Sequence, residues 1–246
     1  MLRLALALMI GLAAPLAAQD LTQMSDADRT AFRAEVRSYL IENPEVLMEA
    51  IAVLDQRRAE AETAGDVALA QANADALMND GFSWVGGNLN GDVTLVEFMD
   101  YRCAYCRKAH DEVAALIETD GNIRFIIKEF PILGEQSTLS SQFAIAVKQL
   151  HGDDLYYDMY NALMTMRPDA TADSLTRLAQ AFDLDPAPIF ERMDSPEVAA
   201  VIEKTRALGQ TMRISGTPTF LMNDQMVRGY VPLAQMQQIV ADIRNN

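Results

Sequence analysis

Residues 93–110 read VTLVEFMDYRCAYCRKAH and contain both cysteines of the chain, Cys103 and Cys106. The apolar run 93–99 predicts a buried strand, and the apolar spacing after the cysteines predicts a helix over residues 103–119. The strand therefore delivers a Cys-x-x-Cys pair to the first turn of a helix.

This placement predicts redox chemistry. The free N–H groups and the dipole of a helix N-terminus favour negative charge, so we expect a lowered pKa and a reactive thiolate at Cys103. Cys106 lies one turn further in, where it is shielded and can attack a mixed disulfide formed by Cys103. As a structural disulfide the pair would contribute little to stability, because it closes a very short loop. We therefore predict a redox-active disulfide between Cys103 and Cys106.

The first 18 residues resemble an export signal. Arg3 supplies a positive charge, residues 4–12 form an apolar core, and residues 13–18 are small and helix-breaking. An uncleaved membrane anchor is the alternative. We predict export to the periplasm, an oxidising compartment in which a disulfide can persist.

Composition narrows the class of partner. The chain has 246 residues, half of them hydrophobic, which is enough for a sizeable core. Its formal net charge of −15 argues against nucleic acid as a partner, because phosphates would be repelled.

Residues 19–80 are predicted to be helical. Asn43-Pro44-Glu45 is typical of a helix restart, with an N-cap, a proline at the first helical position and an acid in the first turn. The apolar seams of these helices are too thin to bury enough surface alone. We favour a homo-oligomerisation region, with packing against the rest of the same chain as the alternative.

Residues 81–246 are predicted to form the catalytic domain, since GFSWVGGNLNG at 81–91 reads as a break. The run 123–130 predicts a second buried strand, and a strand–helix–strand unit implies parallel strands with a right-handed crossover. Residues 135–213 form a predicted helical insertion, whose methionines fall mostly at core spacing. Residues 217–230 then predict a β-hairpin, followed by a last helix.

This order of elements resembles the thioredoxin-like fold of the DsbA superfamily over about residues 83–246. The matching motifs are Glu97 to Cys106 (EFMDYRCAYC) and Gly216-Thr217-Pro218-Thr219. The fold class is then α/β: a thioredoxin-like domain with an inserted helical subdomain, preceded by an N-terminal helical segment. Residues 39–47 (YLIENPEVL) resemble the appendage of ScsC/Com1-type members, some of which oligomerise through it.

The resemblance also implies roles for individual residues. Cys103 is the expected nucleophile and Cys106 the resolving thiol. Pro218 is expected to be a cis-proline facing the disulfide, with backbone groups of Thr217 pairing with substrate; a trans-proline at a strand edge is the alternative. Glu97 aligns with a buried acid that relays protons to Cys106, the alternative being an outward-facing strand carboxylate.

One departure concerns the dipeptide between the cysteines. The strongest oxidants of the family have a histidine there, whereas this chain has Ala104-Tyr105. His110 lies outside the motif and is expected at the surface or packed against a helix. The thiolate would then rest on the helix N-terminus, with Arg102 or Arg107 as possible support, which implies a milder site.

We also expect Tyr101 and Tyr105 to contact substrate. The predicted function is a periplasmic thiol:disulfide oxidoreductase that acts on exported proteins with cysteines, as a disulfide donor or as an isomerase or reductase served by a membrane redox partner. No cofactor or metal is expected. The alternatives are a copper-binding protein, with two thiolates and 14 methionines as soft ligands, and a non-redox chaperone.

Overall fold

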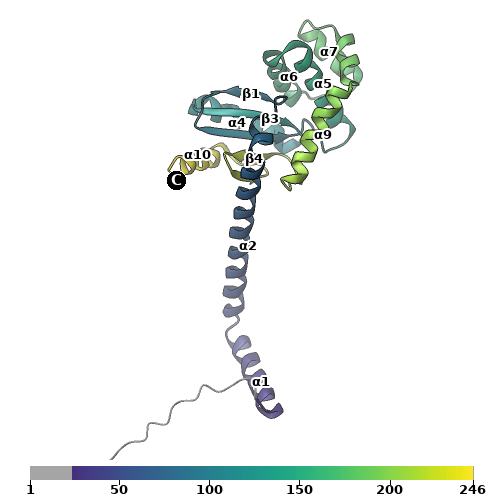
Figure 1. Ribbon diagram of the computed structural model, residues 1–246. Coiled ribbons are helices and arrows are strands. Elements are labelled where there is room, and N and C mark those ends of the chain that lie inside the picture. The colour runs from purple at the N-terminus through teal and green to yellow at the C-terminus, as the bar shows by residue number, and fades with distance from the viewer. Residues whose placement is uncertain (1–23, 246) are drawn as a thin grey trace, which may run out of the picture. The chain divides into compact units, whose positions relative to one another are not determined.

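The computed structural model describes residues 24–245, which divide into two compact units (Figure 1). The first unit ends at Arg58 and the second begins at Ala59. The predicted signal peptide lies outside the described residues. Within residues 24–245, no helix has the length and apolar character needed to cross a bilayer.

A five-stranded sheet organises the second unit, with strand order β1-β3-β2-β4-β5. The predicted parallel pair is present, since β2 and β3 pair in parallel and α4 (Ala104–Asp120) connects them. β4 runs antiparallel to β2, and β5 returns beside it as the predicted hairpin. The strands are β1 (Trp84–Gly87), β2 (Val93–Met99), β3 (Ile123–Glu129), β4 (Thr219–Met222) and β5 (Gln225–Arg228).

Strand β1 forms where the sequence predicted only a break. It pairs antiparallel with β3, with Trp84 opposite Ile127. The ring of Trp84 stacks on Tyr157 with 4.5 Å between ring centroids, and its Nε1–H donates to the carbonyl of Asp153 at 3.0 Å. Long-range packing of this aromatic side chain therefore makes an edge strand out of a glycine-rich segment.

The two faces of the sheet bury different cores, because side chains alternate along each strand. Leu95 of β2 belongs to the larger core, together with α4 and α10 (Leu233–Asn245). Its neighbour Val96 belongs to a second core with Ala70 and Leu77.

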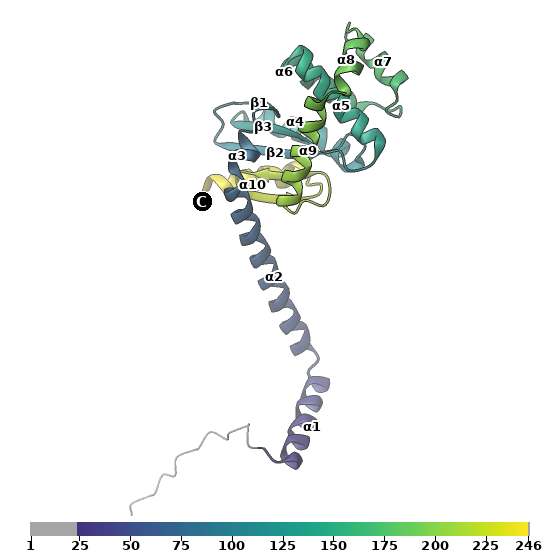
Figure 2. The ribbon, with the colours of Figure 1, turned by 45° about the vertical axis from the view of Figure 1, so that its right-hand side comes forward.

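The helical insertion follows β3, and its helices gather beyond one end of the sheet (Figure 2). Cap residues begin two of them: the side chain of Thr171 accepts from the N–H of Ser174, and that of Ser195 accepts from the N–H of Val198. The helices are α5 (Glu135–His151), α6 (Asp153–Thr165), α7 (Ala172–Ala181), α8 (Pro186–Met193) and α9 (Pro196–Thr211). Its methionines are mostly buried, as predicted for core residues: Met159, Met164, Met193 and Met212.

The second unit starts earlier in the chain than the boundary predicted at residue 81. It includes the C-terminal part of α2 (Glu45–Ala72) and all of α3 (Ala74–Met78). Asp66 of α2 forms a salt bridge with Arg228 of β5. Lys128 of β3, which is buried, donates to Asp80 at 2.6 Å. These long-range ion pairs leave no periodic signal in the sequence, so the boundary could not be predicted from it.

The first unit comprises α1 (Asp26–Glu42) and the beginning of α2. The predicted restart is present, because α1 ends at Glu42 and α2 begins at Glu45. No residue of α1 is buried. Large apolar side chains with 40 to 66% of their surface exposed occupy both helices of this unit: Phe32, Val36, Tyr39, Ile41, Leu47, Met48, Ile51, Val53 and Leu54.

Candidate active site

The two cysteines lie at the start of α4 as free thiols. Cys103 is the N-cap of this helix, and its sulfur accepts a hydrogen bond from the backbone N–H of Cys106 at 3.4 Å. In its protonated form the Cys103 thiol donates to the carbonyl of Thr217 at 3.1 Å. The nucleophile candidate therefore sits between a helix N-terminus and the loop that precedes β4.

Hydrogen bonds at this position lower the pKa of Cys103 to about 5. The largest cause is the hydrogen bond from the Cys106 thiol, and burial acts in the opposite direction. The side chain of Thr217 and the backbone N–H groups of Cys106 and Tyr105 lower the pKa further. At neutral pH Cys103 is therefore a thiolate, which is the reactive form.

Cys106 has the opposite character. It is fully buried, as predicted from its position one turn into the helix, and burial raises its pKa. Its hydrogen bond to Cys103 and the charge of Glu97 raise the pKa further. Cys106 thus stays protonated unless a nearby group takes its proton.

Glu97 is a buried acid whose charge acts on Cys106. It lies on β2, points inward and is fully buried, so the outward alternative is wrong. Tyr160 of α6 donates to its Oε2 at 3.4 Å, and its Oε1 has no hydrogen-bond partner among the described residues. Burial raises the pKa of Glu97 to about 8. A carboxyl group that changes charge near neutral pH can give a proton to a buried sulfur or take one from it.

The Thr217–Pro218 peptide bond is cis, as the resemblance implied. The carbonyl of Pro218 accepts from the N–H of Gly229 at 2.8 Å, which joins this loop to the end of β5. The carbonyl of Thr217 accepts a hydrogen bond from Cys103 only while that thiol is protonated, and the N–H of Thr217 donates no hydrogen bond within residues 24–245. That N–H is available to an incoming chain.

Tyr101 corrects one expectation from the sequence, because it cannot touch a substrate. Only 1% of it is exposed, and its hydroxyl donates to Oε1 of Glu129 at 2.7 Å. Tyr156 donates to the same oxygen at 2.7 Å, and burial raises the pKa of Glu129 to about 7. Tyr105, by contrast, is 61% exposed beside Cys103 and is accessible to a substrate.

Asp100 is a buried residue that the sequence analysis missed. Its Oδ1 accepts from the N–H of Arg102 at 2.8 Å, and its Oδ2 accepts from the N–H groups of Ile132 and Leu133 at 2.8 and 3.0 Å. Its carbonyl accepts from the N–H of Cys103 at 3.1 Å. Asp100 therefore connects the turn that carries Cys103 to the segment after β3. The available signal was an acid directly after a buried strand.

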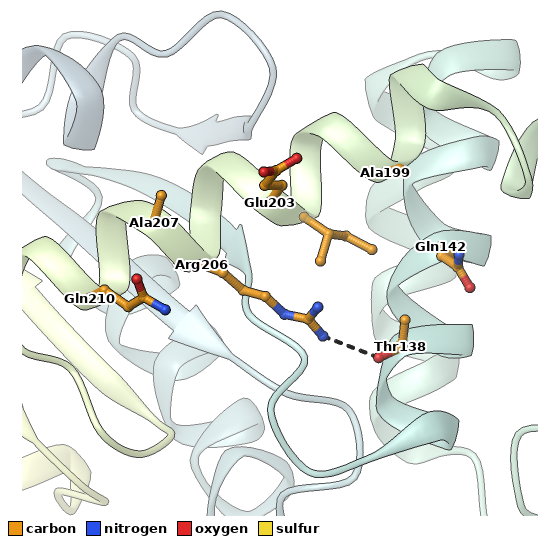
Figure 3. A pocket seen from close by; sticks show the side chains of 8 residues that line it. Thr138, Gln142, Ala199, Glu203, Arg206, Ala207 and Gln210 are labelled. Atoms are coloured by element: carbon orange, nitrogen blue, oxygen red, sulfur yellow. Dashed lines mark hydrogen bonds between the residues drawn. The ribbon is translucent and has the colours of Figure 1, made fainter.

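The segment after β3 is held in turn by α9. Arg206 donates to the carbonyl of Pro131 at 2.6 Å and to the hydroxyl of Thr138 at 3.2 Å (Figure 3). These side chains border an open cavity of about 550 Å³ between α5 and α9, which neither cysteine lines. We therefore assign Arg206 a supporting role in the position of this segment.

The other cationic candidates near the thiols are engaged elsewhere. Arg102 pairs with Asp169 at 2.6 Å. Arg107 donates to the carbonyls of Tyr101 and Met166, each at 2.7 Å. The expected hydrogen bonds from the helix N-terminus are present, the Cys106 thiol adds another, and Arg102 and Arg107 are bound to other groups.

His110 is buried rather than exposed. Its ring makes an edge contact with Tyr160, with 5.1 Å between ring centroids, so the helix-packing expectation is confirmed. Burial lowers its pKa, which keeps the imidazole neutral. Across residues 24–245, no cluster of three or more His, Cys, Asp or Glu side chains has the geometry to hold a metal ion.

Two family models match the chain. The model described as thioredoxin matches residues 79–242. The model described as the copper resistance protein ScsC N-terminal domain matches residues 28–61.

Individual proteins similar to this chain include thioredoxin-like and disulfide-forming proteins. The chain is 25% identical over 166 residues to disulfide bond formation protein D of Bacillus subtilis, covering 63% of this chain and 73% of that protein. A thioredoxin-like oxidoreductase from Silicibacter pomeroyi is 40% identical with a TM-score of 0.65, covering 70% of this chain and 98% of that one. A periplasmic thioredoxin-like protein from Salmonella enterica serovar Typhimurium is 25% identical with a TM-score of 0.62, covering 69% and 94%. Na⁺/H⁺ antiporter NhaA sequences also match, and the chain spans 22 to 25% of their length.

Proposed function

The chain belongs to the thioredoxin family, as an ScsC-like disulfide oxidoreductase of the DsbA superfamily, and from this premise we propose that it exchanges disulfides with exported proteins through Cys103 and Cys106. The observation that carries the proposal is the asymmetry of the two thiols. The pKa of Cys103 is about 5, whereas burial raises the pKa of Cys106. One sulfur is thus ready to attack and the other is held back until a mixed disulfide forms.

In the reducing direction, the Cys103 thiolate attacks one sulfur of a client disulfide. A Cys103–client disulfide forms, the client S–S bond breaks, and the other client sulfur leaves as a thiolate. Cys106 then loses its proton and attacks the Cys103 sulfur, which releases the second client thiolate. The client gains two electrons and the protein is left with the Cys103–Cys106 disulfide.

In the oxidising direction, a client thiolate attacks Cys103 of the disulfide and Cys106 leaves. Glu97 fits this step, because a carboxyl group with a pKa of about 8 holds a proton at neutral pH. The raised pKa of Cys106 means that its departing sulfur takes that proton. Glu97 then carries the charge, with the Tyr160 hydroxyl as its hydrogen-bond donor. The reducing direction uses the same transfer in reverse.

The acidity of Cys103 is the basis on which we propose an isomerase rather than a disulfide donor. A pKa of about 5 lies between the value of about 3.5 for a strong oxidant such as DsbA and that of about 7 for thioredoxin. Such a site suits an isomerase, which must be reduced to attack mispaired client disulfides and can also transfer its own disulfide to a client. A membrane redox partner would keep the thiols reduced in the periplasm. The predicted export signal and the periplasmic relative support this location.

We further propose that the first unit joins copies of this chain. The support is its set of exposed apolar side chains, among them Phe32 and Ile51, which find no cover within residues 24–58. Together these side chains are too apolar for a free surface and are typical of an interface. The name of the matching family model mentions copper resistance, but residues 28–61 contain neither cysteine nor histidine here. We therefore do not assign copper binding to this unit.

A scrambled-disulfide assay tests the proposal. Wild-type protein in a glutathione buffer is expected to restore activity to an inactive client with mispaired disulfides. Cys103→Ser is expected to abolish this activity, and Cys106→Ser is expected to accumulate the client as a mixed disulfide. If Cys103→Ser reactivated the client at the wild-type rate, the proposed chemistry would be wrong. Reactivation that survives loss of both cysteines would indicate a non-redox chaperone.

A further inference from the structure

A ledge lies beside Cys103, formed by the exposed residues Tyr105 and Lys108 and the half-buried Tyr230. The rings of Tyr105 and Tyr230 are stacked with 6.3 Å between their centroids. The Lys108 ammonium lies 3.9 Å from the centroid of the Tyr230 ring. Tyr105 and Lys108 come from α4, and Tyr230 comes from the loop between β5 and α10.

Hydrogen bonds hold the ledge in place beside the two cysteines and the Thr217–Pro218 loop. Oε1 of Glu112 accepts from the Tyr230 hydroxyl at 2.6 Å, and its Oε2 accepts from the N–H of Leu233 at 2.6 Å. Gly229, the residue before Tyr230, donates to the carbonyl of Pro218. The ledge therefore connects the two sides of the active site, the helix with Cys103 and the loop with Pro218.

The ledge carries a positive charge on an acidic protein. The formal net charge is −15, yet Lys108 forms no salt bridge within residues 24–245. Two acids follow Lys108 within one turn of α4: Glu112 is bound to Tyr230 and Leu233, and Asp111 forms no salt bridge with Lys108. The ammonium therefore interacts with the ring and the hydroxyl of Tyr230 and forms no direct pair with a carboxylate of the described residues.

We propose that this ledge is a subsite for an acidic side chain adjacent to the reactive cysteine of a client. This inference rests on the proposed function, which brings a client cysteine to Cys103. A client segment that pairs with the free N–H of Thr217 runs next to the exposed ring of Tyr105. Its neighbouring side chain then meets two aromatic rings and an ammonium that forms no salt bridge. Charge complementarity at such a rim favours Asp or Glu and disfavours Lys or Arg.

Three short peptides test the preference. Each has one cysteine, joined by a disulfide to an aromatic thiol that absorbs light on release, and Glu, Gln or Lys beside that cysteine. Cys103 attacks the peptide sulfur, the mixed disulfide with the peptide forms, and the aromatic thiolate leaves. Dividing each second-order rate constant by that for the uncharged thiol 2-mercaptoethanol with the same peptide removes the intrinsic effect of the neighbour on reactivity.

The structure supplies matched variants for this test. We expect wild-type protein to prefer the Glu over the Lys peptide about five-fold, since exposed ion pairs contribute about 0.2–1 kcal/mol each. Lys108→Gln should reduce the preference below about two-fold, and Lys108→Glu should reverse it. Lys204→Gln is the control, because Lys204 also lies over an aromatic ring, that of Phe82 at 5.6 Å, but on α9. In about 1 M salt, where the screening length is about 3 Å, the preference should vanish.

The outcomes separate the two proposals. If the wild-type protein reacts equally with all three peptides, or if Lys108→Gln keeps the full preference, the subsite is refuted and the exchange chemistry stands. A fourth peptide, with Phe beside the cysteine, tests the rings alone. If it reacts faster than the Glu peptide, and equally so in Lys108→Gln, the ledge is a site for aromatic side chains and the proposal is overturned. If no peptide reacts at all, the proposed function fails and the subsite fails with it.

Discussion

Replacement of Cys106 by alanine tests how the protein makes Cys103 acidic. The hydrogen bond from the Cys106 thiol is the largest of the effects that hold the pKa of Cys103 at about 5. Cys106→Ala removes that donor, but the backbone N–H groups of residues 105 and 106 and the side chain of Thr217 remain. The pKa of Cys103 should therefore rise without reaching the ordinary value of about 8.5.

The size of this rise follows from the strength of one hydrogen bond. A hydrogen bond to a charged group contributes about 1.5–3 kcal/mol. Since one pKa unit corresponds to about 1.4 kcal/mol, the expected rise is about one to two units, to a pKa of about 6–7. At pH 7 the thiolate fraction of Cys103 would then fall from about 99% to about 50–90%.

The ultraviolet absorbance of the thiolate, or the rate of alkylation by iodoacetamide, measures this pKa as the pH is varied. In the wild-type protein both signals should rise through about pH 5 and stay constant above it. In Cys106→Ala the midpoint should move upward, whereas Cys106→Ser retains a hydroxyl donor and should stay close to the wild type. If Cys106→Ala leaves the midpoint unchanged, or if the wild-type midpoint is near 8.5, the assignment of the thiolate stabilisation to these donors is wrong.

Four other predictions concern separate parts of the molecule. Glu97→Gln should slow the release of Cys106 during oxidation of a client about 100-fold in single-turnover experiments. The wild-type rate, corrected for client ionisation, should fall above about pH 8 as Glu97 loses its proton. An equal fall in the variant would contradict the role of Glu97 as proton donor to Cys106. Lys128→Met should lower the free energy of unfolding by about 3 kcal/mol in urea titrations, because it leaves Asp80 in a buried site without its cation; a change within error would show that the pair is solvated. The pKa of Cys103 is lowered on folding, so its thiolate stabilises the reduced folded protein relative to Cys103→Ser. This difference in the free energy of unfolding should be absent below about pH 5, increase by a few kcal/mol up to about pH 8.5 and stay constant above that. A difference that does not vary with pH would argue against a thiolate in the folded state. Phe32→Asp should lower the molar mass measured by analytical ultracentrifugation without loss of helix content, and an unchanged mass would remove this face from any interface.

The fold could be predicted because its signals are local. The strand before Cys103, the helix after it, the second strand and the Thr217–Pro218 hairpin each have a pattern within a few residues. The resemblance then supplied the cis bond, which no local pattern indicates. Asn43-Pro44 likewise marked the start of α2 correctly.

The supporting parts of the site could not be predicted, because their partners lie far apart in the chain. Glu129 meets Tyr101 across 28 residues, and Glu97 meets Tyr160 across 63. Tyr101 looked like a surface residue because it adjoins the cysteines, but an internal carboxylate draws its hydroxyl inward. The association of α3 and the end of α2 with the second unit was not predicted for the same reason, since the pair of Lys128 and Asp80 joins residues that are 48 apart.

The single tryptophan of the chain offers a built-in optical sensor. Trp84 sits at the edge of the sheet, against the ring of Tyr157 and the first turn of α6. The same helix carries Tyr160, which contacts Glu97 beneath the thiols. Intrinsic fluorescence of the unmodified protein therefore reports on the seating of α6 against the sheet. A change in emission between the dithiol and disulfide forms would record movement of that helix during the catalytic cycle, without any attached dye.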